Sequence, residues 1–204
     1  MARQAKDPYI RRAKKEHYRS RAAYKLIEID DKFSLLRSGQ CIVDLGCAPG
    51  GWLQVIRKRA HTPDTTIIGI DLLPMLPIEG TTIHTADFQS DHIRHTIFPK
   101  GNRGVNVVLS DMAPATTGDR KTDHLRIMNL CEGSRDFALQ VLEPDGALVT
   151  KIFQGGSEKQ FTVSLKPHFK AIHFFKPQSS RKDSVELYIL ALGFCGNAPD
   201  ITEF

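Results

Sequence analysis

The chain has 204 residues, of which 41% are hydrophobic, enough for one compact domain with a buried core but not for two. Charged residues make up an ordinary 25%, and neither a signal peptide nor an apolar run of membrane-spanning length occurs, so we expect a folded cytoplasmic protein. The four cysteines form no C-x-x-C pair and the histidines no cluster with other ligands, so we expect no metal site.

Positive charge gathers at the start of the chain. The formal charge is +5, yet residues 1–25 hold nine Lys or Arg against two acidic residues, which gives +7 for this segment and −2 for the rest. A basic segment on a near-neutral body is typical of proteins that bind a phosphate backbone. The alternative is a solvated, flexible terminus. We place a basic arm at residues 1–19, one domain at 20–195 and a short tail at 196–204.

A helix is predicted after this arm. Ser20 can cap it, and Ala22, Leu26, Ile29 and Phe33 share one helical face. Lys25 lies off that apolar stripe, as does its neighbour Tyr24, and is therefore expected to face a cleft or solvent.

Short apolar runs then alternate with amphipathic stretches, which is typical of an α/β sheet with crossover helices. The predicted strands are Gln40–Leu45, Thr66–Asp71, Thr81–His84, Val105–Ser110, Ala147–Phe153, Ala171–Lys176 and Ser184–Leu192. The predicted helices between them are Gly50–Arg59, Asp91–Phe98, Thr122–Leu142 and Ser157–Leu165, with a turn at Pro144–Gly146. Only residues 177–183 separate the last two strands, too few for a helical crossover, so that pair must be antiparallel.

A glycine-rich loop follows the first predicted strand, with Gly46, Gly50, Gly51 and then Trp52. Glycines there let the backbone approach a ligand at the carboxyl edge of the sheet. Ala48 and Pro49 depart from the G-x-G-x-x-G pattern of dinucleotide sites, which favours a ligand without a diphosphate and disfavours a nicotinamide-dependent dehydrogenase.

Acidic residues end the next two strands. Asp71 is placed to accept the ribose hydroxyls of an adenosine, and Asp87, followed by Phe88, to accept its amino group. Either aspartate alone is as well explained as a helix cap. The glycine loop and both aspartates at successive strand ends favour a nucleoside site.

Five ordered motifs carry a resemblance to a known family: DLGCAPGGW at 44–52, DLLP at 71–74, SDMAP at 110–114, KIFQG at 151–155 and KPQSSRKDSVELY at 176–188. From about Tyr9 to Gly193 the chain resembles the FtsJ/RrmJ family of ribosomal RNA 2′-O-methyltransferases. The resemblance implies a Rossmann-like methyltransferase fold, with helices on both faces of a seven-stranded, mostly parallel sheet that has one antiparallel strand. It also implies S-adenosylmethionine as methyl donor, with Gly50, Trp52, Asp71, Asp87 and Asp111 in contact with it; we add Gly46 and Gly51 from the loop.

The family uses a Lys-Asp-Lys-Glu tetrad, which matches Lys25, Asp111, Lys151 and Glu186 here. A ribose hydroxyl is a poor nucleophile, so its proton must leave as the methyl is transferred, and a suitably placed lysine can act as the base. Lys151 and Glu186 lie inside otherwise apolar strands and need partners. The alternative is that these two residues form only a structural ion pair. We assign Lys151 to the 2′-hydroxyl proton, Asp111 to holding Lys151, and Lys25 and Glu186 to tuning charge and positioning the ribose.

The implied substrate is large-subunit ribosomal RNA, at a uridine of the peptidyl-transferase region, bound by a monomer. Tyr9 and Tyr18 interleave with the basic residues of the arm, and a second basic cluster lies at 176–182, so stacking and phosphate contacts are both expected. Alternatives are a tRNA methyltransferase, which Met112 and the DLLP segment disfavour, and a non-catalytic RNA-binding assembly factor. Ala115 stands where the ribosomal branch usually has Asn, which bears on how the acceptor nucleotide is held.

Overall fold

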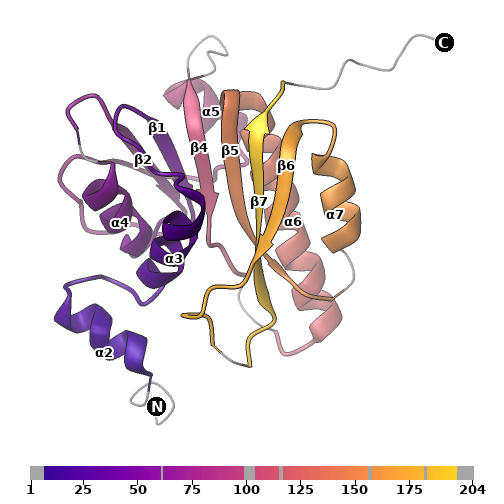
Figure 1. The fold of residues 1–204 in the computed structure, drawn as a ribbon, viewed down its shortest axis with the longest axis horizontal. Coiled ribbons are helices and arrows are strands. Elements are labelled where there is room, and N and C mark those ends of the chain that lie inside the picture. Colours follow the sequence, from indigo (N-terminus) through magenta and orange to yellow (C-terminus); the bar gives the residue numbers. More distant parts are fainter. Residues whose placement is uncertain are drawn as a thin grey trace.

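The computed structural model describes residues 7–60, 62–98, 104–114, 117–155, 158–181 and 183–196, the side chains of 120 and 121 excepted. Within these ranges a single sheet is flanked by helices (Figure 1). No helix of the described residues is long and apolar enough to cross a membrane. Ala115, the first six residues of the predicted arm and most of the predicted tail lie outside the described ranges.

The sheet has seven strands in the order β3-β2-β1-β4-β5-β7-β6. Their bounds are β1 Cys41–Leu45, β2 Thr66–Asp71, β3 Thr82–Thr85, β4 Val105–Ser110, β5 Leu142–Phe153, β6 Phe169–Phe175 and β7 Glu186–Phe194. The first five strands pair in parallel, whereas β7 is antiparallel to both β5 and β6. The predicted fold class, including the single antiparallel strand, is confirmed.

Helices connect or precede these strands. Within the described residues they are α2 Pro8–Lys15, α3 Ala23–Phe33, α4 Gly51–Arg59, α5 Asp91–Ile97, α6 Arg120–Val141 and α7 Glu158–Leu165. The predicted turn at Pro144–Gly146 falls inside β5, which begins five residues earlier than predicted. It survives there as an irregularity: Asp145 has a φ of +65°, and the register with β4 shifts between Val105 and Val107.

Successive residues of each strand point to opposite faces of the sheet, and in these strands both sets are apolar. Both faces therefore have to be covered by helices. On one face Val43, Ile68 and Val108 pack with buried residues of α5, α6 and α7. On the other face Ile42, Val107 and Leu190 pack with α3 and α4. The strands are thus buried on both faces, as their continuous apolar runs predict.

The start of the chain differs from the prediction. Residues 8–15 of the predicted arm form α2, which Asp7 caps by accepting a hydrogen bond from the Tyr9 amide (3.0 Å). Ser20 does not cap α3, so that prediction was wrong: α3 begins at Ala23 and its N-cap, Ala22, makes no side-chain cap bond. The Ser20 side chain instead lies against Gly51 at the start of α4.

The β6–β7 connection lies at the carboxyl edge of the parallel strands. Because β7 runs antiparallel to β5, its first residue, Glu186, pairs with Phe153 at the end of β5. Figure 1 shows this connection at the end of the sheet where α2 and α3 lie. The described part of the basic cluster at 176–182 therefore belongs to the same end of the molecule as the predicted site.

Candidate active site

The glycine loop is held tightly against the second strand and the segment after β4. The amides of Gly46 and Cys47 both donate to the carbonyl of Ile70, at 2.8 and 3.3 Å. Gly46 has a φ of +73°, and a Cβ added there would clash with Cγ of Met112. Glycine is required at this point because both the backbone conformation and the close approach exclude a side chain.

A cavity of about 910 Å³ opens at the carboxyl ends of β1, β2 and β4. Four of the predicted cofactor-binding residues line it, namely Gly46, Asp71, Asp87 and Asp111. Its apolar walls include Ile70, Phe88, Met112, Leu125 and Leu130. This is the sheet edge at which open α/β folds bind their ligands.

Backbone amides hold the two strand-end aspartates in place. The Asp71 carboxylate accepts hydrogen bonds from the amides of Ala48 and Leu73, both at 2.8 Å. Asp87 accepts one from the amide of Gln89 at 2.9 Å. The bond from Ala48 ties the glycine loop to the end of β2, so Asp71 shapes the cavity as well as lining it.

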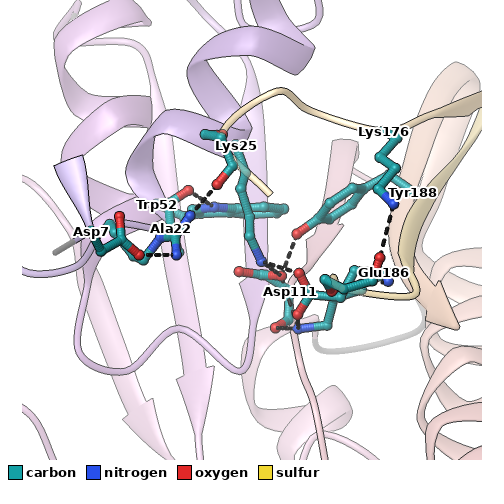
Figure 2. Close-up of polar contacts among 12 residues, drawn as sticks. Asp7, Ala22, Lys25, Trp52, Asp111, Lys176, Glu186 and Tyr188 are labelled. Carbon is teal, nitrogen blue, oxygen red and sulfur yellow. Dashed lines mark hydrogen bonds and ion pairs between the residues drawn. The ribbon is translucent and has the colours of Figure 1, made fainter. Parts of the chain in front are cut away.

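The other predicted cofactor-binding residues, Gly50, Gly51 and Trp52, do not line this cavity. They lie at the start of α4, where a Cβ on Gly51 would clash with Oγ of Ser20. The Trp52 indole is 3% exposed and donates to the carbonyl of Ala22 at 2.8 Å, as Figure 2 shows. Its side chain thus anchors α4 to the segment that leads into α3.

The four predicted tetrad residues contact one another, and Figure 2 shows three of them, Lys25, Asp111 and Glu186. Nζ of Lys151 lies 3.0 Å from Oδ1 of Asp111 and donates to the Asp111 carbonyl at 2.6 Å. Nζ of Lys25 lies 3.4 Å from the same Oδ1 and 3.1 Å from Oε2 of Glu186. Nζ of Lys151 lies 3.9 Å from Oε1 of Glu186. Two ammonium groups and two carboxylates therefore alternate around the cluster, as charges buried away from water must.

Asp111 is the centre of this arrangement. Burial alone would raise the pKa of its carboxyl, but the charges of Lys151 and Lys25 and a hydrogen bond from Tyr188 outweigh burial and lower the pKa below its ordinary value. Asp111 is therefore a carboxylate at neutral pH.

Sequence reasoning did not assign a role to Tyr188. Its hydroxyl donates to Oδ1 of Asp111 at 2.5 Å, and its ring packs 6.0 Å from that of Trp52. Burial, the negative charge of Asp111 and the hydrogen bond to it raise the pKa of Tyr188 well above its ordinary value, so the hydroxyl stays protonated. The only signal in the sequence is its position two residues after Glu186, on the same face of β7.

A second hollow, of about 410 Å³, also borders the cluster, and we call it the active-site hollow. Lys25 and Glu186 line it together with Arg21, Arg181, Asp183 and Ser184. Lys25 thus faces a cleft, as predicted. Since Asp111 lines the large cavity, the charged cluster borders both openings.

The charged cluster can transfer protons and can orient a polar group by charge and hydrogen bonding. It can hold a proton on either lysine, accept hydrogen bonds through either carboxylate, and orient a polar group that enters between the two openings. No group of three His, Cys, Asp or Glu side chains placed to hold a metal ion is found in the part of the chain that the structure describes.

Comparison with known proteins finds a family match over most of the chain: residues 18–194 match the family described as FtsJ-like methyltransferase. A protein of Novosphingobium aromaticivorans named ribosomal RNA large subunit methyltransferase E is 50% identical over 200 residues, which cover 98% of this chain and 89% of the relative. A protein of the same name from Sphingopyxis alaskensis is 49% identical over 196 residues, 96% of this chain and 84% of the relative.

Among solved structures, the chain is similar to one from Plasmodium falciparum that is described as a putative ribosomal RNA methyltransferase. The TM-score is 0.79 at 32% identity, and the match covers 88% of this chain and 100% of the other.

Proposed function

Since the chain belongs to the FtsJ-like methyltransferase family, we propose that it transfers a methyl group from S-adenosylmethionine to a ribose 2′-oxygen of large-subunit ribosomal RNA. One observation carries the proposal: Asp111 lines the large cavity and also binds both lysines of the charged cluster. A methyl donor in the cavity and an acceptor in the active-site hollow would meet at that residue. The names of the relatives favour ribosomal RNA as the substrate.

The cavity fits the proposed cofactor in size and in chemistry. Asp71 and Asp87 present carboxylate oxygens that suit ribose hydroxyls and an adenine amino group, and Phe88 and Leu125 supply apolar wall for the base. Asp111 adds a further negative charge, which suits a cationic ligand. S-adenosylmethionine supplies an electrophilic methyl group on a sulfonium. We propose that Gly46, Gly50, Gly51 and Trp52 contribute backbone contacts at the loop and the start of α4.

In the proposed reaction Lys151 first gives its ammonium proton to solvent, and its free amine then takes the 2′-hydroxyl proton as the oxygen–methyl bond forms and the methyl–sulfur bond breaks, which restores the ammonium. Asp111 holds the Lys151 ammonium through two contacts, its carboxylate and its carbonyl oxygen. Lys25 and Glu186, which line the active-site hollow, position the ribose. Alignment of the acceptor with the methyl group is the main contribution of these residues, because in-line displacement depends on geometry.

Two alternatives differ in substrate or in activity. A tRNA methyltransferase would keep the same cluster and accept another RNA. A non-catalytic assembly factor would bind cofactor and RNA without turnover, but the complete charged cluster favours an enzyme.

We propose that the chain consists of a basic arm at 1–19, a methyltransferase domain at 20–195 and a tail at 196–204. We also propose that it is a monomeric, cytoplasmic enzyme that acts at a uridine of the peptidyl-transferase region.

The test uses labelled S-adenosylmethionine with undermethylated large ribosomal subunits, free ribosomal RNA and total tRNA. We expect label in large-subunit RNA, at a linkage that resists alkali, and roughly a hundredfold lower rate for Lys151→Ala at saturating cofactor. Label in tRNA alone would overturn the substrate, and label at a base would overturn the ribose assignment. Cofactor binding without transfer to any RNA would favour the assembly factor.

A further inference from the structure

A separate pocket of about 600 Å³ lies where α2, α3 and the end of β6 meet, and it is called the tyrosine pocket below. Aromatic rings and cations dominate its lining: Tyr9, Arg12, Tyr24, Lys32, Phe175 and Lys176. Among the described residues, it shares no lining residue with the active-site hollow or with the large cavity.

Rings and cations are already paired in this pocket. The rings of Tyr9 and Tyr24 lie 5.4 Å apart, and the Arg12 guanidinium lies 4.6 Å from the centre of the Tyr24 ring. Nζ of Lys32 lies 4.9 Å from the centre of the Phe175 ring. Surfaces that combine aromatic faces with Lys and Arg bind single-stranded nucleic acid, because bases stack on rings while the cations meet phosphates.

The two carboxylates in the lining are held in place by contacts with other groups. Glu28 accepts hydrogen bonds from the amides of Gln178 and Ser179, at 2.5 and 2.9 Å. Asp31 pairs with Arg59 at 2.7 Å. Both carboxylates keep their charge, but the three cations of the lining outnumber them and leave it with a net charge of +1, although Arg12 also pairs with Glu16 at 2.7 Å.

Three elements are tied together so that the pocket exists before any ligand binds. Arg21 donates both to the carboxylate of Asp7, which caps α2, and to the carbonyl of Ser179 in the β6–β7 connection. Glu28 joins α3 to the same connection. Preformed walls reduce the ordering cost of binding.

The tyrosine pocket is also close to the site of reaction. Helix α3 supplies Lys25 to the active-site hollow, and Glu28 and Lys32 to the pocket. At 1.5 Å of rise per residue these positions are about 5 to 10 Å apart along the helix axis, the scale of the step from one nucleotide to the next.

We propose that the tyrosine pocket binds a nucleotide that neighbours the acceptor in the substrate RNA. Its base stacks on the rings of Tyr9 and Phe175, and its phosphates contact Arg12, Lys32 and Lys176. This inference rests on the proposed function, because it takes an RNA strand as the occupant of the active-site hollow.

The first test measures equilibrium binding of in-vitro transcribed large-subunit ribosomal RNA to the full chain across a range of salt concentrations. We expect the double variant Lys32→Glu/Lys176→Glu to bind roughly tenfold more weakly or worse, with a log–log salt slope reduced by about 0.7 for each phosphate that is no longer neutralised. The double variant Lys159→Glu/Lys166→Glu makes the same charge change at two exposed residues outside the pocket, so it is the matched control and should bind like the parent chain. The affinity for S-adenosylmethionine should not change in any of these variants.

The second test detects the base directly. RNA that carries 4-thiouridine beside the acceptor should crosslink to the peptide that holds Tyr9 or the one that holds Phe175. Tyr9→Phe keeps the ring and should bind RNA like the parent chain, whereas Tyr9→Ala should bind about tenfold more weakly.

Each result decides a separate question. Parent-like RNA binding by the double Lys variant and by Tyr9→Ala would overturn the inference. Normal binding of free RNA with weaker binding of assembled subunits would overturn it in favour of a protein partner. Weaker RNA binding in a chain that transfers no methyl group would uphold the pocket and contradict the proposed function.

Discussion

Tyr188 fixes the position of Asp111 together with the two lysines, and it is the part of the cluster that can be removed without changing the net charge. Tyr188→Phe deletes one hydrogen bond to a carboxylate, an interaction that contributes about 1.5 to 3 kcal/mol when one partner is charged. Because that bond lowers the pKa of Asp111, its removal should raise this pKa. We expect the acidic limb of the pH–rate profile to move to higher pH, with a smaller decrease in rate than in Lys151→Ala.

The comparison that isolates this effect uses Tyr24→Phe, which removes a hydroxyl that donates to Glu16, outside the cluster. Its acidic limb should coincide with that of the parent chain. An unmoved acidic limb in Tyr188→Phe would show that Asp111 does not govern it.

Asp44 is a buried carboxyl beside the active site that the proposed reaction does not use. It is 1% exposed and its Oδ2 has no hydrogen-bond partner among the described residues. Burial, with the negative charges of Asp111 and Asp71, raises the pKa of Asp44 well above its ordinary value. A raised carboxyl pKa destabilises the fold above the unfolded-state pKa, because folding must then keep a proton that the unfolded chain releases.

Asp44→Asn removes this cost. Its free energy of unfolding relative to the parent chain should therefore increase as pH rises from about 4, at up to about 1.4 kcal/mol per pH unit until the folded-state pKa is reached. Denaturant unfolding at several pH values measures the trend. The exposed Asp64→Asn should show no comparable trend, and a pH-independent difference for Asp44→Asn would contradict the assignment of a protonated Asp44.

Among the helices and strands, α2 is the element that sequence patterns missed. Its eight residues are strongly basic and supply little to the core, Ala13 being its one buried residue, so their charge favoured an arm although polar and apolar residues do segregate along the helix. The signal for its start is Asp7 before Pro8, a residue that suits the first turn of a helix. Ser20 is a suitable cap by residue type alone, but a cap depends on backbone geometry that the sequence does not reveal.

The cap gives a prediction for this element. Asp7→Ala should reduce local helix stability by about 1 kcal/mol and remove the contact that ties Arg21 to α2. Hydrogen exchange should show faster exchange of the α2 amides, and RNA affinity should fall while cofactor affinity does not.

Asp7→Asn separates the two roles, since Asn caps a helix well but carries no charge to pair with Arg21. Protection of the α2 amides should be largely retained in that variant. Equally weak protection in both variants would mean that the ion pair, rather than the cap, holds the helix.

Across the whole molecule, the sequence predicted the fold best where the burial of a strand or helix determines its pattern of apolar residues. Continuous apolar runs predicted parallel strands covered on both faces, and the short connection after β6 predicted the antiparallel β7. The convergence of Lys25, Asp111, Lys151 and Glu186 came from the family resemblance, because contacts between residues as distant as 25 and 186 leave no periodic signal. The burial of the Trp52 side chain and the formation of the tyrosine pocket both depend on how separate elements pack together. Local sequence patterns do not reveal such packing.

Cofactor binding should stabilise the entire domain, because the large cavity draws its walls from the ends of β2 and β4, the glycine loop and α6. A ligand at about a hundred times its Kd adds about 2.7 kcal/mol to the free energy of unfolding, which for a chain of this size raises Tm by roughly 5 to 10 °C. Asp71→Asn, which keeps one acceptor oxygen but not the charge, should reduce the rise in Tm on adding S-adenosylmethionine, measured against its own ligand-free Tm. Lys151→Ala should keep the full rise, since Lys151 does not line the cavity. A full rise in Asp71→Asn and none in Lys151→Ala would place the cofactor on the opposite side of Asp111 and reverse the assignment of the two openings.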